Sequence, residues 1–330
     1  MEYRNIPDIY FDSSYPKLYE KMENGKARTI YVSNEHGTVI SHVLLRKIVI
    51  STEKQYYDLV TPYGYGGPII TSLKGDREKL IQSFFDEMTR FTKENKIVSE
   101  FVRFHPIIGN GIDFKDIYNS QFDRKTVGTN VRDYELEEEF SKSARKYIKR
   151  AIKAGITYEI IINPQEVNEF KEVYYSTMDR DQADCYYYFD DEYFEQCIQR
   201  LGEHVLYVKV YLENKVIAAG FYFVYGDIIE CHLSGSLSEY LHLSPAYITK
   251  IATAKWAKEH GIHFIHYGGG TSRDQENSLY QFKKKFGKNT EFDFYIGKKI
   301  WNKKAYAELC RIKGIDSEVE YFPAYRQTKK

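Results

Sequence analysis

The sequence has few cysteines, and no two of them have a metal-binding or redox spacing. Cys185, Cys197, Cys231 and Cys310 are widely separated and include no C-x-x-C pair. Zinc knuckles and disulfide frameworks both need closely or regularly spaced cysteines, so neither is expected. We therefore expect reduced cysteines that serve as packing residues, and no metal site.

Long apolar runs are also missing. The apolar runs, such as residues 160–162 or 216–219, fall far short of the roughly 20 residues that a membrane-spanning helix requires. The first residues lack the charged stretch followed by an apolar stretch that is typical of a secretory signal. The expectation is a cytoplasmic protein without an integral membrane segment.

Neither sign of charge dominates. Lys plus Arg and Asp plus Glu each number 47 among 330 residues, so the formal net charge is zero. Attraction of the whole surface to nucleic acid or to anionic lipid is therefore not expected. Local runs of charge have to be considered instead.

The clearest local run lies in residues 137–154, which begin with three glutamates and continue with basic residues. Acidic residues near the N-terminus of a helix and basic residues near its C-terminus interact favourably with the helix dipole. Helical spacing places Lys142, Lys146, Lys149 and Lys153 on one stripe. This stripe suits a tRNA acceptor stem or a phosphate-bearing precursor, and it is equally compatible with a solvated helix face.

The length fits two domains of about 150 residues each. The first half is rich in strands and contains one amphipathic helix. We expect a hairpin from residues 28–33 and 38–50, a helix over 76–95 and a strand over 97–104.

The second half alternates strands and helices in a recognisable order. The expected strands are 156–162, 205–212, 216–225, 228–233 and 262–267, and the expected helices are 165–178, 191–201 and 245–260. The order β, α, α, β, β, β, α, β is that of an acetyltransferase (GNAT) half. A further helix over 278–286, a strand over 291–296 and a helix over 303–312 complete the chain.

The strongest candidate for chemistry is a run of three glycines, Gly268, Gly269 and Gly270, between a strand and a helix. Glycines leave backbone amides bare, and a strand that opens into a helix can hold an anion or an oxyanion. Lysines 283–285 on the helix would add positive charge. A flexible loop followed by a solvated lysine cluster is the alternative interpretation.

The pattern Gly-Gly-Gly-Thr, a spacer, and Leu-x-x-Phe-Lys-x-x-Phe-Gly ending at Gly287 resembles the C-terminal signature of the Fem (FemABX) aminoacyl and peptidyl transferases and their acetyltransferase-like relatives. The resemblance implies that Lys283 lies at the active site and assists amide formation. It also implies that Gly269 and Gly270 contact the substrate.

Two further segments are similar to that family. The segment from Phe170 to Arg180 matches a family helix that ends in Thr-x-x-Arg, with Thr177 in the threonine position. The resemblance implies that Arg180 contacts the diphosphate of a nucleotide-linked precursor, for which the planar guanidinium is suited. A surface arginine between Asp179 and Asp181 is the alternative.

The loop over residues 62–68 resembles the family loop that lines the acceptor cleft. The resemblance implies substrate contacts from Tyr63, Gly64 and Tyr65, whose rings could stack on a sugar or a base. A tight turn with packing tyrosines is the other interpretation. In the central strand of a GNAT sheet, His232 or Ser234 could orient a nucleophile, although a core histidine is an equally ordinary role.

One GNAT feature is missing. The glycine-containing loop that binds the pyrophosphate of coenzyme A does not precede Pro245, where residues 237–244 stand instead. No coiled-coil arm interrupts the second half. An aminoacyl-tRNA or an acyl-coenzyme A thus remains open as the donor substrate, and no tightly bound cofactor is expected.

These observations predict a mixed α/β fold of two tandem GNAT-like domains, covering 1–140 and 141–299, with residues 300–330 packing back on the first. The predicted function is transfer of an aminoacyl group from charged tRNA to an amine of a cell-envelope, peptide or sugar precursor. The alternatives are an acyl-coenzyme A-dependent N-acyltransferase for an amino sugar in surface polysaccharide biosynthesis, and a non-catalytic binding protein. The acceptor and the oligomeric state stay open.

Overall fold

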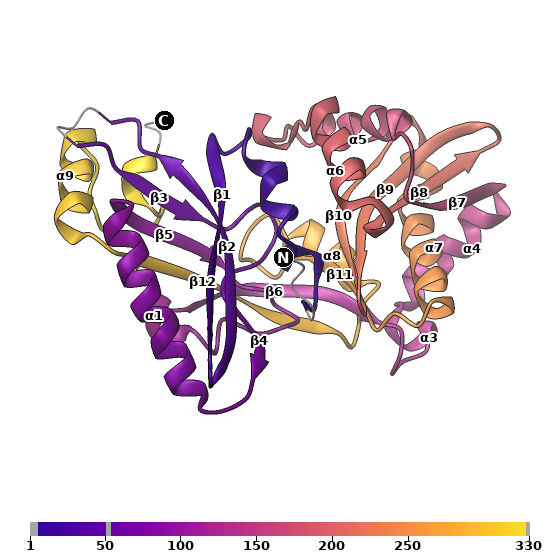
Figure 1. Cartoon of the computed structure of the whole chain (residues 1–330). Coiled ribbons are helices and arrows are strands. Elements are labelled where there is room, and N and C mark those ends of the chain that lie inside the picture. Colours follow the sequence, from indigo (N-terminus) through magenta and orange to yellow (C-terminus); the bar gives the residue numbers. More distant parts are fainter. Residues whose placement is uncertain (1–5, 51–53, 328–330) are drawn as a thin grey trace. The chain divides into compact units, whose positions relative to one another are not determined.

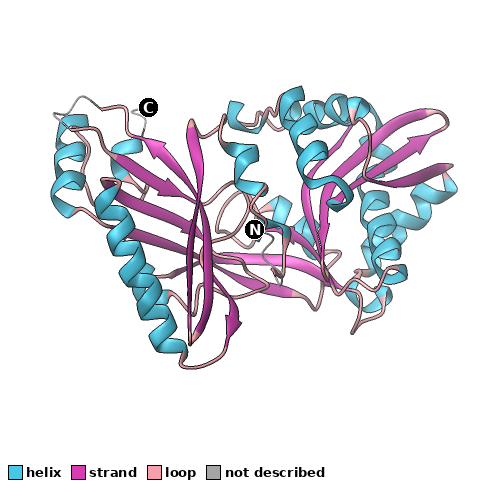
Figure 2. Ribbon diagram, viewed as in Figure 1, coloured by secondary structure: helices cyan, strands magenta, loops and turns pink. Residues whose placement is uncertain are grey.

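The computed structural model describes residues 6–50 and 54–327, which form a mixed α/β structure (Figure 1 and Figure 2). The chain divides into two compact units. Unit 1 holds Tyr10–Asp123 and the chain from Asp293 onward, and unit 2 holds Pro7–Ile9 and Arg124–Phe292. Two strands, β6 (Gln121–Asn130) and β12 (Glu291–Ile300), therefore each contribute residues to both units.

The domain ranges expected from the sequence remain predictions. In the observed division, residues 124–140 are grouped with unit 2 and residues 293–299 with unit 1. Residues 1–5, 51–53 and 328–330 of the expected ranges lie outside the described part of the chain.

Unit 1 is built on a mixed sheet. Its strands follow the order β1, β2, β3, β5 and β12, and β4 pairs with the other end of β2. Apart from β12, the strands of this unit are β1 (Gly25–Asn34), β2 (Gly37–Lys47), β3 (Tyr57–Val60), β4 (Ile69–Leu73) and β5 (Ile97–Arg103). The β1–β2 hairpin is confirmed, and it closes where Asn34 pairs with Gly37.

Helix α1 (Arg77–Glu94) packs on this sheet through one apolar stripe. Asp76 begins the helix because its carboxylate accepts a hydrogen bond from the Lys79 amide at 3.1 Å. Leu80, Phe84 and Met88 follow at helical spacing and are fully buried. They join strand residues in one core cluster, so the helix expected over residues 76–95 is confirmed.

The last part of the chain completes unit 1. Helix α9 (Lys303–Lys313) buries Tyr306 and Leu309 in a cluster with Val98 of β5. The Tyr325 hydroxyl lies 2.7 Å from the Ser99 hydroxyl. Residues far apart in the sequence therefore share one core. A short helix, α2 (Lys115–Tyr118), adds two further buried side chains to unit 1.

In unit 2 the neighbouring strands follow the order β6, β11, β10, β9, β8 and β7. Its remaining strands are β7 (Ile156–Ile162), β8 (Val205–Leu212), β9 (Lys215–Tyr225), β10 (Ile228–Ser236) and β11 (Phe264–Gly268). Strands β7 to β10 form an antiparallel meander, whereas β11 runs parallel to β10. The strand and helix order expected for a GNAT half is thereby confirmed.

Helices cover both faces of the unit 2 sheet (Figure 1). One face carries α4 (Lys142–Lys153), α7 (Pro245–Glu259) and α8 (Ser278–Lys284), whose apolar side chains share a core cluster with the strands. The other face carries α5 (Asn168–Arg180) and α6 (Asp191–Leu201). There the Phe170 and Phe194 rings pack on the ring of Phe221 from β9.

One expected helix is divided in the structure. Instead of a single helix over residues 137–154, the chain forms α3 (Leu136–Glu139) and then α4. Phe140 is extended between them, and its buried ring packs against Phe286. Ser141 then begins α4 by accepting a hydrogen bond from the Ala144 amide at 3.1 Å. Burial of Phe140 therefore outweighs continuous helix propensity.

Within the described residues, none of the helices combines the length and the hydrophobicity that crossing a bilayer demands.

Candidate functional site

Lys283 lies on α8, just after the glycine-containing loop of unit 2. Asn277 begins this helix, since its side-chain oxygen accepts hydrogen bonds from the amides of Leu279 and Tyr280, each at 3.2 Å. One helical turn further on, the Lys283 Nζ donates a hydrogen bond to the Gly269 carbonyl oxygen at 2.7 Å. The structure thus brings together Lys283 and Gly269, two of the residues that the sequence singled out.

The electrostatics of Lys283 are unusual for a lysine. Burial, and then repulsion by the charge of Lys250, lower the pKa of Lys283 from 10.5 to about 7, although Cys231 acts in the opposite direction. An amine with such a pKa is about half neutral at neutral pH, and therefore carries a lone pair that can accept a proton. Perturbed groups of this kind cluster at functional sites.

The glycines contribute carbonyl groups to the observed contacts. The Gly269 carbonyl accepts from Lys283, and the Gly270 carbonyl accepts from Arg124 Nη1 at 3.0 Å. A side chain at Gly270 would bring its Cβ within 2.5 Å of the Asn277 side-chain oxygen. The close packing of the loop explains why glycine stands there, and an oxyanion role for the loop amides stays a prediction.

Arg180 lies at the end of α5, where that helix meets β10. Its guanidinium donates to the Ser236 carbonyl and the Ser238 hydroxyl, both at 3.2 Å, and pairs with Asp181 at 3.3 Å. Gly235 permits this close approach of α5, because a Cβ there would lie 2.5 Å from the Val173 carbonyl oxygen. Arg180 is thus already held by local partners, and its role with a diphosphate stays a prediction.

His232 and Cys231 are neighbours on β10, and their side chains point to opposite faces of the sheet. His232 Nε2 lies 2.6 Å from the Tyr193 hydroxyl of α6, and its ring packs 4.6 Å from that of Phe223. Burial lowers the pKa of His232 to about 3, so the imidazole is neutral at physiological pH. The structure therefore does not bring His232 to Lys283, and Ser234 is exposed further along the same strand.

The tyrosine loop belongs to unit 1 and is tightly held there. Arg103 donates to the Gly64 carbonyl at 3.1 Å, and the Tyr15 hydroxyl donates to the Tyr63 carbonyl at 2.7 Å. The Tyr65 ring packs edge-on against Phe294 with 5.2 Å between ring centroids. These contacts make the loop rigid. Stacking of Tyr63 or Tyr65 on a ligand stays a prediction.

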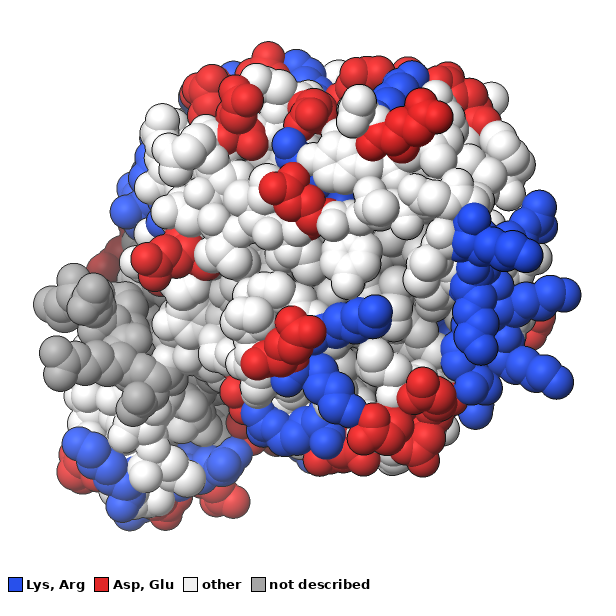
Figure 3. Space-filling view, turned by 90° about the vertical axis from the view of Figure 1, so that its right-hand side faces the viewer, with Lys and Arg blue, Asp and Glu red and all other residues white. Residues whose placement is uncertain are grey.

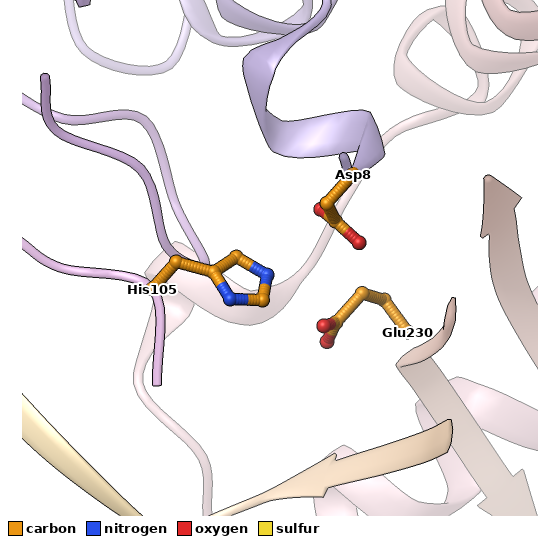
Figure 4. A group of neighbouring side chains, drawn as sticks. All are labelled: Asp8, His105 and Glu230. Carbon is orange, nitrogen blue, oxygen red and sulfur yellow. The ribbon is translucent and has the colours of Figure 1, made fainter. Parts of the chain in front are cut away.

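A buried polar chain in unit 2 was not expected from the sequence. Glu230 Oε2 lies 2.8 Å from His266 Nδ1, and His266 Nε2 lies 2.9 Å from the Thr126 hydroxyl. A carboxyl oxygen of Asp8 lies within 4.8 Å of one of Glu230 (Figure 4). Figure 4 also labels His105, which belongs to unit 1. Since all three linked side chains are buried, this chain ties β10, β11 and β6 together.

Sequence reasoning missed Lys250 beside Lys283. The signal was present: Lys250 stands at helical spacing from Tyr247, Ala254 and Ala257, all buried on the apolar face of α7. Lys255, on the other face, is exposed. A charged residue in the apolar stripe of a helix marks a buried charge, which is rare without a role.

Part of the chain is similar to a known protein family. Residues 139–284 match the family model of the acetyltransferase (GNAT) domain. This segment contains the α4 to α8 part of unit 2, including Lys250 and Lys283. No curated protein matches the sequence.

Similar solved structures extend the likeness to the whole fold. The crystal structure of FemX has a TM-score of 0.69 at 16% identity, covering 91% of this chain and 94% of that chain. The structure of L-PGS from Bacillus licheniformis has a TM-score of 0.57 at 12% identity, covering 91% and 95%. The expected fold, GNAT-like α/β halves without a coiled-coil arm among the described residues, is confirmed, as is the resemblance to Fem and GNAT proteins at the level of the fold.

Proposed function

We propose that the protein is an acyltransferase that forms an amide bond, transferring an aminoacyl group from charged tRNA to an amine-bearing precursor. The observation that carries this proposal is the Lys283 amine, which belongs to a partly buried side chain, donates to the Gly269 carbonyl and has a pKa of about 7. The same lysine falls in the segment that matches the acetyltransferase model. Acyl transfer to an amine is the chemistry for which such a group is suited.

In the proposed reaction the amine nitrogen of the acceptor attacks the carbonyl carbon of the aminoacyl ester. The ester C–O bond breaks, and the new C–N bond forms. The nitrogen must then lose a proton, which the neutral Lys283 Nζ accepts, and the ribose oxygen of the leaving tRNA receives one. No covalent enzyme intermediate is required. The hydrogen bond to Gly269 orients the lysine nitrogen during this step.

Helix α4 supports a polyanionic donor. Lys142, Lys146, Lys149, Arg150 and Lys153 are exposed, and the helix contains no acidic residue. A dense group of basic side chains stands at the right-hand edge of the face drawn in Figure 3. Such a surface complements the phosphates of a nucleic acid. We assign it to the tRNA acceptor stem.

The acceptor is proposed as a cell-envelope, peptide or sugar precursor that carries a free amine. Arg180 would contact a diphosphate of that precursor from the end of α5. Its side chain is about one-third accessible, and a guanidinium binds phosphate oxygens in a bidentate manner. To do so it would have to exchange its contact with Asp181 for the ligand.

An acyl-coenzyme A donor is the second candidate, favoured by the match to an acetyltransferase model. Residues 237–244, which precede α7, fit it poorly. They contain no glycine, and Ser238–Leu243 forms a 3₁₀ helix whose Tyr240 and Leu243 pack against the core. A loop of exposed amides for the pyrophosphate is therefore not formed by this segment.

Mass spectrometry of the acceptor distinguishes the candidates. Purified protein is incubated with amine-bearing envelope precursors and either aminoacyl-tRNA or acyl-coenzyme A. We expect an aminoacyl adduct with tRNA, and loss of turnover by roughly 100-fold or more in Lys283→Met. Lys284→Met is the matched control, because Lys284 lies on the same helix but forms an ion pair with Glu291 of β12. Complexes without product from either donor would indicate a binding protein and refute the proposal.

A charge-reversal pair tests the tRNA surface separately. In Lys146→Glu/Lys149→Glu, the KM for aminoacyl-tRNA should rise about tenfold, and its dependence on salt should become shallower, because fewer counterions are released. Lys303→Glu/Lys304→Glu on α9 makes the same charge change on another exposed helix. Equal effects of the two pairs would remove α4 from the tRNA interface.

A further inference from the structure

A second lysine lies buried next to Lys283. Lys250 of α7 is only 5% exposed. Its Nζ lies 4.5 Å from the centroid of the Tyr267 ring and 5.4 Å from that of Tyr222. An ammonium over the face of an aromatic ring is stabilised by the ring quadrupole, most strongly where water is excluded. The charge of Lys250 is thus held in place by the sheet.

The aromatic and thiol groups around Lys250, those of Tyr222, Tyr267 and Cys231, all have pKa values raised by burial and are neutral at physiological pH. Burial lowers the pKa of Lys250, but its electrostatic interactions with Cys231 and Tyr222 outweigh this effect and raise the pKa above the ordinary value. Burial in turn raises the pKa of the Cys231 thiol to about 11. Among the described residues, no carboxylate forms an ion pair with Lys250. A buried cation without a counter-ion is costly, and this arrangement is not explained by stability.

Lys250 and Lys283 share the same surroundings. The Cys231 thiol on β10 interacts with both amines, and the positive charge of Lys250 acts directly on Lys283. Geometry links the two amines through the end of β11: Lys250 lies over the ring of Tyr267, and the carbonyl of Gly269, two residues further along the chain, accepts a hydrogen bond from Lys283. Two lysines so placed do not both carry a proton easily, because like charges in a low dielectric repel each other.

We propose that Lys250 is a positioning residue for Lys283: its fixed positive charge, anchored over Tyr222 and Tyr267, keeps the Lys283 amine unprotonated and ready to accept a proton. The two lysines have distinct tasks. Lys250 keeps its proton because it has aromatic faces, a hydroxyl and a thiol as partners. Lys283 has a carbonyl as acceptor for one N–H and retains its lone pair. The link to turnover rests on the proposed function, whereas the protonation of Lys283 does not.

Competitive labelling of amines tests the proposal without any substrate. The folded protein is treated with trace acetic anhydride at a series of pH values, and acetylation of the peptide containing Lys283 is quantified by mass spectrometry. In Lys250→Met the midpoint of Lys283 labelling should rise by about one pH unit or more. In Lys250→Arg, which keeps the charge, it should stay near the wild-type value. Lys255→Met, on the exposed face of the same helix, should leave it unchanged.

A second readout follows activity. If Lys283 is the proton acceptor, the acidic limb of the pH–kcat profile should move to higher pH in Lys250→Met, together with the labelling midpoint. In Lys250→Arg this limb should lie near its wild-type position. An unchanged midpoint in folded Lys250→Met would overturn the proposal, and Lys250→Gln provides the same test if the methionine variant does not fold. A shifted midpoint without amide product from any donor would retain this inference and reject the proposed function.

Discussion

Replacing Lys283 by methionine should make unit 2 more stable at neutral pH. Folding lowers the pKa of the wild-type lysine from 10.5 to about 7, so at neutral pH about half of the folded molecules lose a proton that the unfolded chain keeps. Linkage puts this cost at up to about 4 kcal/mol at pH 7 and about 2 kcal/mol at pH 9. Since the unfolded state binds more protons in this window, wild-type stability rises with pH. Methionine has a similar length and carries no proton.

The lost hydrogen bond to Gly269 opposes the gain. Its removal costs about 1 kcal/mol at every pH, so we expect a net gain of about 3 kcal/mol at pH 7 and about 1 kcal/mol at pH 9. The chain has two tryptophans, Trp256 in unit 2 and Trp301 in unit 1. Urea unfolding in a Trp301→Phe background, followed by the fluorescence of Trp256, therefore reports on unit 2 alone.

The change of the stability difference with pH is the decisive quantity. Lys284→Met, whose lysine is paired on the surface with Glu291, should show less than about 1 kcal/mol of difference at either pH. If Lys283→Met were no more stable than wild type at pH 7, and the difference were the same at pH 9, Lys283 would be protonated in the folded protein. The reasoning about its chemistry would then be wrong.

Three other substitutions probe buried groups. Burial raises the pKa of Glu100 from 4.5 to about 7, so the free energy of unfolding of unit 1 should fall by about 2 to 3 kcal/mol between pH 5 and 8. Glu100→Gln should abolish this fall in urea unfolding followed by Trp301 fluorescence. An equal dependence on pH in both proteins would contradict the prediction. Burial lowers the pKa of His232 from 6.5 to about 3, so the free energy of unfolding of unit 2 should fall by about 3 kcal/mol between pH 7 and 4. His232→Phe should remove most of this acid sensitivity. An equal fall in the variant would show that other groups cause the acid sensitivity. In Gly287→Ala the new Cβ would overlap the Gly128 carbonyl oxygen at 1.8 Å, which should lower the free energy of unfolding by roughly 3 kcal/mol or more. Gly66→Ala, whose Cβ would lie 3.7 Å from the nearest atom, is the control. Equal melting temperatures of the two variants would refute the clash.

Elements with strong local signals were predictable from the sequence. Helix α6 and strand β8 have the expected bounds, Asp191–Leu201 and Val205–Leu212. Asp190 begins α6 by accepting from the Tyr193 amide at 3.0 Å, and β8 is a run of apolar and aromatic residues. Periodicity and capping are properties of a few neighbouring residues, so they can be read without tertiary information.

Elements that depend on distant partners were not predictable. Strand β6 has a polar sequence, and Thr126 and Thr129 are buried only because they meet His266 and Tyr267 across the sheet. The division between α3 and α4 likewise depends on the contact of Phe140 with Phe286. In both cases the decisive interaction joins residues more than 100 positions apart.

The candidate site was predicted only in part, for the same reason. The glycine-lysine pattern pointed to Lys283 and Gly269, which the structure does bring together. Lys250 and Cys231 come from a different helix and strand, and nothing in the local sequence links them to Lys283. Their effect on its protonation arises only when α7, β10 and α8 pack together.

The division of the chain has a consequence for biosynthesis. Unit 2 is complete once the ribosome has added Phe292, whereas unit 1 still lacks β12 and α9 at that moment. Val98 and Ile48, made more than 200 residues earlier, have to wait for Leu309 and Tyr325 before their apolar surface is covered. During that interval the nascent chain carries a finished second unit beside an exposed patch on the first, which is the kind of surface that chaperones bind.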